Sequence, residues 1–375
     1  MKFINTFDKH ASEPEKTVDA YIREKKLELG EWVNQRRKVY LDTKFWLLLR
    51  DAHLNRAKEQ SQYDLLRLII NAVSAGQLIC PISEDVFQEV IKQTDEETLR
   101  ATVELIDSLS AGVSLISHDE RLEAELLYFL RSCTKPKERL YNRHHLVWTK
   151  LAYTSGMQIP HNDMFSEAEN RLVQKAFIDQ MWSLPLQEMI NLIGSDRLLT
   201  FPHMPDFSHL MNEEKDSYHA EKADFKKIFL TELGFLLRRE EARFESLFTY
   251  LFEKEHGYPP QPEEVRATNP GRSFANVVYN VFKLQKAGKN LPTIEIEAGI
   301  HAQLIHDKTR RYKANDIHDI NHAIAALPYC DFFFTEKNLR EFVVRKNLAY
   351  DIKYSCTVVS SLTDAVSEMN QIVSL

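Results

Sequence analysis

Two short apolar runs stand out in a chain whose apolar residues otherwise recur mostly at helical spacing. One run, residues 39–41, is followed by Asp42, and the other, within residues 331–335, is followed by Glu336. A short continuous apolar run predicts a strand that is buried on both faces of a parallel sheet. Because ligand sites in such sheets lie outside the carboxyl ends of the strands, we expect both acids to lie at one site.

A helix is predicted directly before the second of these strands. Asn315 and Asp316 form a helix-start pattern, and apolar residues then recur three or four positions apart until Pro328 ends the helix. Asp316 is better explained as a cap than as a ligand, but it stays an alternative. Asp319 lies in the first turns of the same helix, so it can meet the acid that follows the next strand.

The remaining pattern predicts an α/β domain made from two separated parts of the chain. The predicted strands cover residues 39–41, 78–82, 112–116, 331–335 and 353–359. The predicted helices cover residues 14–35, 44–75, 98–110, 294–307, 315–327 and 362–373, with another helix capped by Ser83. Strands that alternate with helices indicate a parallel sheet. Glu89 lies in the Ser83 helix, where Glu84 and Asp85 are alternative site acids.

Between residues 120 and 290 the strand pattern fades and helical periodicity dominates, for example at 176–192 and 225–255. Two proline-rich stretches, 201–207 and 258–272, interrupt it. We therefore divide the chain into four parts. They are an N-terminal helical extension (1–35), a first α/β part (36–120), a mainly helical insertion (121–290) and a second α/β part (291–375).

Composition narrows the class of protein. Hydrophobic and charged contents of 43% and 27% are typical of a soluble globular protein, and no apolar run is long enough for a membrane span. The net charge of −7 argues against a surface coated by nucleic acid, although a local basic stripe stays compatible with it. The four cysteines lack the CxxC spacing of a zinc site and suit a reducing, cytoplasmic compartment.

The order of these acids resembles that of the PIN-domain nucleases. In that family a first strand ends in Asp, a Glu follows the second strand, an Asp opens a later helix, and a strand ends in Thr before another acid. The matching residues here are Asp42, Glu89, Asp319, and Thr335 with Glu336. Glu336 stands where Asp is commoner, and a long insertion separates the second acid from the third. The resemblance covers about half of the chain and implies a PIN-like parallel sheet flanked by helices.

The resemblance also implies a metal-dependent endoribonuclease that cuts single-stranded RNA, with DNA as an alternative substrate. Several carboxylates around one point need a cation to stay ionised, and oxygen ligands suit Mg²⁺ or Mn²⁺ better than zinc. In this hypothesis the four acids, Asp42, Glu89, Asp319 and Glu336, hold the metal and catalyse phosphodiester hydrolysis. Thr43 and Thr335 would hydrogen-bond a carboxylate or a phosphate oxygen.

Basic residues near the acids are candidates for substrate binding. Arg310, Arg311 and Lys313 surround an aromatic residue before the third acid, which suits a single strand of nucleic acid. Residues 36–38 and the basic residues between 135 and 143 form further clusters, which we expect near the mouth of the site and in the insertion. A basic run is nevertheless more often a solvated face than a binding stripe.

Three rival interpretations stay open. His318 and His322 stand four residues apart, which can bind zinc on a helix, but a surface or supporting role is favoured since no third soft ligand is evident. Arg139 and His144 fit the Arg-x4-His pattern of the metal-independent HEPN ribonucleases. A PIN-like scaffold could also bind RNA or a protein without cutting. A homodimer or a regulatory protein partner is compatible with all of these.

Overall fold

Four short parallel strands form the central sheet of the computed structural model, which describes residues 3–134, 142–194, 205–218 and 224–373. Their order is β2-β1-β5-β6, and their bounds are β1 Arg37–Leu41, β2 Leu78–Ile79, β5 Phe332–Phe334 and β6 Thr357–Val359. Phe333 pairs with Tyr40 on one side and Val358 on the other. The first and last parts of the chain thus build one sheet, and the predicted α/β class is confirmed.

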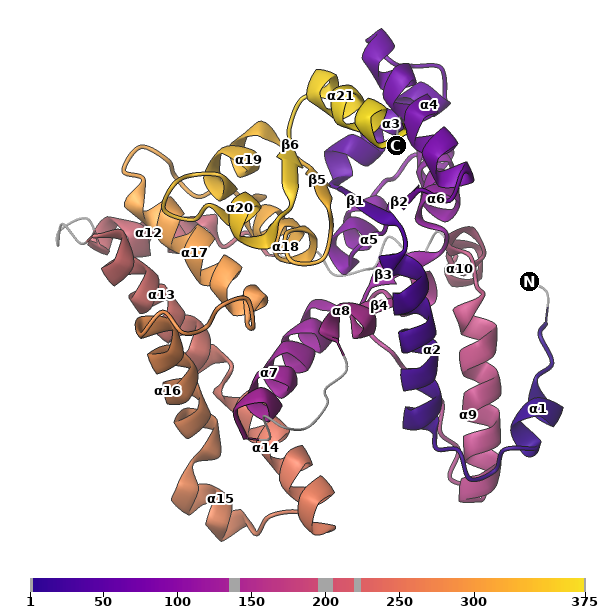
Figure 1. Ribbon diagram of the computed structural model, residues 1–375, viewed down its shortest axis with the longest axis vertical. Coiled ribbons are helices and arrows are strands. Elements are labelled where there is room, and N and C mark those ends of the chain that lie inside the picture. Colours follow the sequence, from indigo (N-terminus) through magenta and orange to yellow (C-terminus); the bar gives the residue numbers. More distant parts are fainter. Residues whose placement is uncertain (1–2, 135–141, 195–204, 219–223, 374–375) are drawn as a thin grey trace.

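Helices cover both faces of this sheet, which explains why its strands are continuously apolar. Phe333, Tyr40 and Leu41 are completely buried. The helices of the first part are α1 Phe7–Ala11, α2 Val18–Asn34, α3 Thr43–His53, α4 Gln60–Ser74, α5 Glu84–Val90 and α6 Glu96–Ser110. Those of the last part are α17 Pro292–His306, α18 Asp316–Ala326, α19 Lys337–Val343, α20 Tyr350–Tyr354 and α21 Leu362–Val373. Figure 1 shows α21 beside α4, although the two are distant in sequence.

The predicted third strand is present, but its main pairing is antiparallel and not part of the four-stranded parallel sheet. β3 Val113–Leu115 pairs antiparallel with β4 Trp148–Lys150, a strand inside the insertion that the sequence did not predict. A single parallel bridge between Ile82 and Ser114 connects β3 to the end of the second strand. Between β3 and β4 the described chain forms α7 His118–Thr134 and α8 Arg143–Leu146.

Three further predictions need correction. Residues 44–75 form two helices, α3 and α4, with Asn55 in the left-handed region between them. The predicted last strand is shorter than expected, because α20 occupies its first residues. Ser83 precedes α5 but its side chain does not cap the helix. Its hydroxyl contacts Tyr40 instead.

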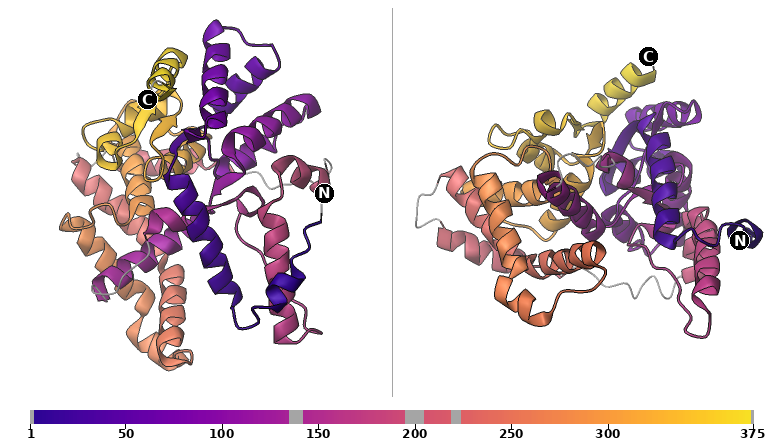
Figure 2. Two further views of the ribbon diagram at one scale, coloured as in Figure 1. Left: turned by 45° about the vertical axis from the view of Figure 1, so that its right-hand side comes forward. Right: turned by 60° about the horizontal axis from the view of Figure 1, so that its bottom comes forward.

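The insertion is mainly helical, as predicted. Besides α7 and α8, it contains the one-turn segment η1 Leu151–Tyr153 and seven described helices. These are α9 Glu167–Trp182, α10 Leu186–Ile193, α12 Ser208–Tyr218, α13 Phe225–Arg239, α14 Glu241–His256, α15 Pro262–Thr268 and α16 Pro270–Lys283. They form two groups, which lie on opposite sides of the molecule (Figure 2). α9 and α10 pack near α2 and α6, whereas α13, α14 and α16 surround a separate core.

Helix α17 joins the two hydrophobic cores of the molecule. Ile294 and Ala298 on this helix belong to the core of the insertion, whereas Ile296, Ile300 and Leu304 belong to the core around the sheet. The α/β part and the α13–α16 group are therefore in direct contact through a shared helix. No helix in the described parts of the chain combines the length and the apolar character that crossing a membrane requires.

Candidate active site

Asp42 and Glu336 lie where the sequence predicted them, at the carboxyl ends of the neighbouring strands β1 and β5. Asp42 is 3% exposed and caps α3, since its Oδ1 accepts a hydrogen bond from the Phe45 amide at 3.1 Å. Glu336 precedes α19 and is exposed. Asp319, in the first turn of α18, is half-buried. The three acids thus come from different elements to the same edge of the sheet.

The pKa shifts of Asp42 and Asp319 have common causes, because both depend on burial and on the charges of His322 and Glu336. Burial raises the pKa of Asp319 to about 7, the negative charges of Glu336, Asp316 and Asp42 add to the effect, and His322 opposes it. Burial also raises the pKa of Asp42 to about 6, and the charge of His322 and the Phe45 hydrogen bond oppose that shift. Burial therefore disfavours the charged form of both carboxyls, and a nearby cation would stabilise it.

A chain of hydrogen bonds lies beside the acids and connects β1, α3, α5 and α18. Tyr40 Oη is 2.7 Å from both Ser83 Oγ and His322 Nδ1. His322 Nε2 is 2.9 Å from Glu89 Oε2, which also accepts a hydrogen bond from the Thr43 hydroxyl. His322 and Tyr40 are buried, so this chain forms the inner wall of the site.

His322, which is buried, and Glu89, which is half-buried, form an ion pair. Burial lowers the pKa of His322, but the hydrogen bond and charge of Glu89 outweigh it and raise this pKa to about 9. Burial raises the pKa of Glu89, but the hydrogen bond and charge of His322 and the Thr43 hydroxyl bring it to about 2. Near neutral pH both groups are charged. Asp85, which accepts a hydrogen bond from Asn321 at 2.9 Å, adds negative charge near the imidazolium.

The role of His322 is the main feature that the sequence interpretation underestimated. His322 was expected on the surface or in support of Asp319, and Glu89 was expected on the metal. The structure instead pairs the two. The spacing of Asp319 and His322, three residues apart on one helix, indicates that both can face the same site. Nothing in the sequence indicates that Glu89 is the partner of His322.

Thr335 is fully buried at the end of β5, and its hydroxyl has no hydrogen-bond partner of good geometry among the described residues. It lies close enough to Asp42 to lower the pKa of that carboxyl. Thr335 therefore supports the buried acid. Of the two roles predicted for Thr335, contact with a carboxylate is compatible with this position, whereas a fully buried hydroxyl is not accessible to a phosphate in this conformation.

The predicted substrate-binding arginines are engaged in ion pairs. Arg310 donates to Asp316 Oδ1, whose second oxygen accepts a hydrogen bond from the Lys313 amide at 2.8 Å. Arg311 pairs with Asp216. Asp316 thus holds the segment before α18 in place, whereas Lys313 and Arg311 are exposed and Arg311 is paired with Asp216.

The cluster at residues 36–38 does not lie near the acids. It stands at the amino end of β1, whereas Asp42 follows the carboxyl end, so the predicted position near the mouth is wrong. Arg36 lies over the ring of Trp32 at 3.7 Å, and the Lys38 ammonium is 3.0 Å from Asp331. These contacts fix the chain entering the sheet.

The elements of the rival HEPN pattern do not form a site in the part of the chain that the structure describes. Arg139, with Lys135 and Lys137, lies outside the described residues. Burial lowers the pKa of His144 to about 4, and its ring packs edge-on against Tyr329. Arg143 donates to the carbonyl oxygen of Asn290 at 2.6 Å, and this hydrogen bond connects α8 to the loop before α17.

The donor chemistry of the acids fits a hard cation, but the predicted four-acid ligand set is not assembled. Among the described residues no group of three or more His, Cys, Asp or Glu side chains is arranged to hold a metal ion. Glu89 is bound to His322, and Glu336 is exposed. Asp42 and Asp319 are near enough for the charge of Asp42 to raise the pKa of Asp319. Since Mg²⁺ commonly keeps several waters and uses one or two protein carboxylates, this pair suits Mg²⁺ or Mn²⁺.

Comparisons with protein-family models, with curated proteins and with solved structures gave no match to this chain. The class of protein is therefore described from the fold alone. It is a mainly helical α/β protein with a four-stranded parallel sheet and acids at the carboxyl ends of its strands.

Proposed function

We propose that the chain is a PIN-like endoribonuclease that hydrolyses phosphodiester bonds of single-stranded RNA with Mg²⁺ or Mn²⁺. The observation that supports this proposal is the pair Asp42 and Asp319, whose pKa values burial raises at the carboxyl edge of a parallel sheet. A cation between the two would stabilise their charged forms and offset the cost of burial. Perturbed carboxyls of this kind are typical of functional sites.

The surrounding side chains have distinct parts in this proposal. Asp42 and Asp319 bind the ion through their carboxylate oxygens, and Glu336 approaches from the exposed side. His322 holds Glu89 away from the ion and places a positive charge beside the two aspartates, which limits their mutual repulsion. When bound, the ion would polarise the phosphodiester group and lower the pKa of the attacking water.

Cleavage of a labelled single-stranded RNA with Mg²⁺ or Mn²⁺ tests the proposal. We expect Asp42→Asn and Asp319→Asn each to lower the cleavage rate by about a hundredfold or more, which is roughly 3 kcal/mol of transition-state stabilisation. Glu341→Gln is the matched control, because Glu341 is an exposed acid on α19 that pairs with Lys337. Cleavage that persists in EDTA, or equal rates for the wild type and Asp42→Asn, would contradict the proposal.

A second candidate function is a scaffold that binds RNA or a protein partner without cutting. The observation that favours it is the missing third ligand, because Glu89 is engaged by His322 and by Thr43. Calorimetric titration with Mn²⁺ discriminates the two. A nuclease should bind Mn²⁺ and lose that binding in Asp42→Asn, whereas a scaffold of this kind should show little uptake of Mn²⁺ in either protein.

A further inference from the structure

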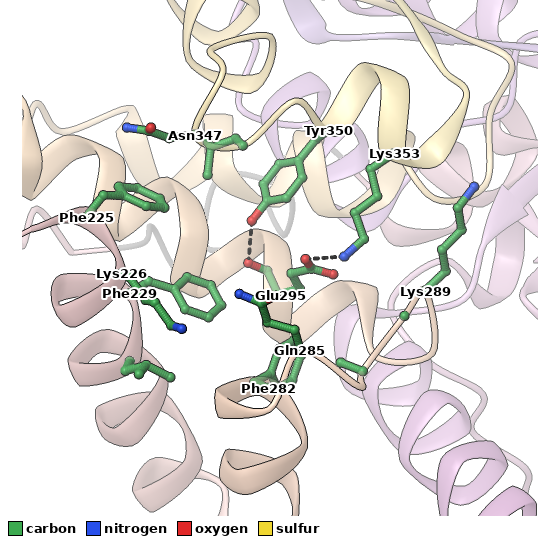
Figure 3. A pocket seen from close by; sticks show the side chains of 14 residues that line it. Phe225, Lys226, Phe229, Phe282, Gln285, Lys289, Glu295, Asn347, Tyr350 and Lys353 are labelled. Carbon is green, nitrogen blue, oxygen red and sulfur yellow. Dashed lines mark hydrogen bonds and ion pairs between the residues drawn. The ribbon is translucent and has the colours of Figure 1, made fainter.

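A second hollow lies where the helical insertion meets the α/β part, and none of the proposed site acids lines it. Its volume is about 480 Å³, within the usual range for small-molecule sites. It is bounded by α13 and by the loop after α16 on one side, and by α17 and α20 on the other (Figure 3). Contacts between two parts of a chain are a common place for ligand pockets.

One wall of this pocket is aromatic. Phe225 and Phe229 come from α13, and Phe282 comes from the end of α16. Phe229 and Phe282 pack edge to face with ring centroids 6.1 Å apart, which fixes their orientation. In Figure 3 the rings of Phe225 and Phe229 lie on one side of the space, opposite Tyr350. A planar ring placed there would contact aromatic surface.

The opposite wall is polar but internally satisfied. The Glu295 carbonyl accepts a hydrogen bond from Tyr350 Oη at 2.8 Å, and its carboxylate is bound by the Lys353 ammonium and by Tyr354 Oη. Figure 3 shows the Glu295–Lys353 pair beside Tyr350. Because Lys353 already neutralises Glu295, this wall neither requires nor repels a charge on a ligand.

Two cations at the pocket are not neutralised in this way. Lys226 and Lys289 are exposed, and neither ammonium has an ion-pair partner among the residues described. The side-chain amides of Gln285 and Asn347 also line the pocket and offer donors and acceptors. In Figure 3 Gln285 lies between the phenylalanines and Glu295. The pocket therefore combines aromatic surface, amide groups and two exposed lysines, of which Lys226 lies beside the phenylalanines and Lys289 on the opposite side (Figure 3).

We propose that this pocket binds a mononucleotide, independently of the acids at the sheet edge. The base would stack on Phe225 and Phe229, since every base has a π-face that packs on aromatic side chains. The amides of Gln285 and Asn347 would hydrogen-bond the edge of the base. A phosphomonoester is negatively charged at pH 7, and the exposed Lys226 ammonium, which lies beside the phenylalanines in Figure 3, would bind it.

The lining of the pocket favours a ligand with both an aromatic ring and an anionic group over a ligand with only one of these. A purely apolar molecule would leave the lysines and amides without partners of its own, and an isolated phosphate would leave the phenylalanine wall exposed to water. A ligand that spans both walls would also connect α13 with α17 and α20. Binding is therefore expected to stabilise the contact between the insertion and the α/β part.

Isothermal titration calorimetry of the full chain with AMP, in EDTA, tests this proposal separately from the metal site. We expect AMP to bind about tenfold more tightly than either adenosine or inorganic phosphate. Lys226→Gln should weaken AMP about tenfold without changing the weak binding of adenosine. Phe225→Ala should weaken AMP and adenosine alike. Lys283→Gln is the matched control, because Lys283 is an exposed lysine at the end of α16 that does not line the pocket.

Three results would overturn the proposal: no binding of AMP at millimolar concentration, equal affinities of AMP for the wild type and Lys226→Gln, or equal affinities of the wild type for AMP and phosphate. Lys226 is exposed, so its substitution leaves the core intact and the test does not depend on Phe225→Ala folding. Because EDTA removes divalent ions, loss of AMP binding and loss of RNA cleavage are independent outcomes.

Discussion

At the scale of single residues, the carboxyl group of Asp42 has one stabilising and one destabilising effect on the fold. Its Oδ1 caps α3, which any oxygen at that position can do, whereas its negative charge is disfavoured by burial. A substitution that keeps the oxygen atom but removes the charge can therefore separate these two effects. In the ion pair of His322 and Glu89, by contrast, the charge of each group stabilises the charge of the other.

Asp42→Asn should stabilise the metal-free protein at high pH. The folded pKa of about 6 lies above the ordinary value of 3.8, so the native state loses stability as the pH rises from about 4 through 6. Asparagine keeps the capping oxygen and has no charge. We expect a gain of about 2–3 kcal/mol at pH 8 and almost none at pH 4, measured by urea unfolding in EDTA. A less stable variant at pH 8 would show that burial does not penalise this carboxylate.

His322→Ala should destabilise the protein by about 3 kcal/mol near pH 6, because it leaves Glu89 charged and without its partner. The folded pKa of His322 is raised to about 9, so its contribution is complete below pH 6.5 and disappears as the pH rises through 9. The lowered pKa of Glu89 makes its contribution complete above pH 4.5 and lost as the pH falls toward 2.

Urea unfolding from pH 3 to pH 10 measures this profile. The difference between the wild type and His322→Ala should be largest between about pH 4.5 and 6.5 and smaller at both extremes. His53→Ala is the control, since His53 faces Glu104 at 3.7 Å on the surface and should change stability by less than about 0.5 kcal/mol. A constant difference at all pH values would mean that His322 contributes by packing alone.

At the scale of elements, close helix contacts depend on positions without a side chain. Gly30 on α2 faces α8, where an added Cβ would lie 2.2 Å from the carbonyl oxygen of His145. That oxygen belongs to the backbone, so the helices would have to separate. Gly234 on α13 differs, because its nearest neighbour would be the flexible end of Arg238 at 3.7 Å.

Gly30→Ala and Gly234→Ala should therefore have opposite effects. We expect Gly30→Ala to lower the free energy of unfolding by about 1–3 kcal/mol through steric overlap. Gly234→Ala should raise it by about 0.5–1 kcal/mol, because alanine is the better helix former. Chemical unfolding of both variants measures the two changes. A stabilising effect of Gly30→Ala would show that α2 and α8 are not in close contact.

At the scale of the whole molecule, two cores share α17, so they should unfold together. All four tryptophans lie in or against the core around the sheet: Trp32, Trp46, Trp148 and Trp182. Their fluorescence therefore reports on that core alone, whereas circular dichroism reports on helices in both. Leu233, fully buried on α13, belongs only to the core of the insertion.

Leu233→Ala should lower the overall stability by about 2–5 kcal/mol through the cavity it leaves. Because α17 connects the cores, we expect the fluorescence midpoint in urea to fall together with the circular dichroism midpoint. A fluorescence midpoint that stays at the wild-type value while the circular dichroism midpoint falls would show that the insertion unfolds independently.

Much of the architecture could be predicted from local pattern. The apolar runs within residues 39–41 and 331–335 are short and continuous, which favours strands covered on both faces, and the two strands are adjacent in the sheet. Helices such as α6, α17 and α21 were predicted close to their observed bounds because their apolar spacing is regular. Because Asp42 and Glu336 come just after these strands, their position at the carboxyl edge of the sheet could be predicted as well.

The sequence by itself determined which segments form strands and helices and at which strand ends Asp42 and Glu336 lie, because burial and periodicity act locally. Only the tertiary structure decided the partners: β3 with β4, Glu89 with His322, and Arg310 with Asp316. Such pairings depend on which elements the folded chain brings together, and on the charge and burial that result. The spacing of residues along the chain does not indicate which elements meet, or how buried and charged their contacts are.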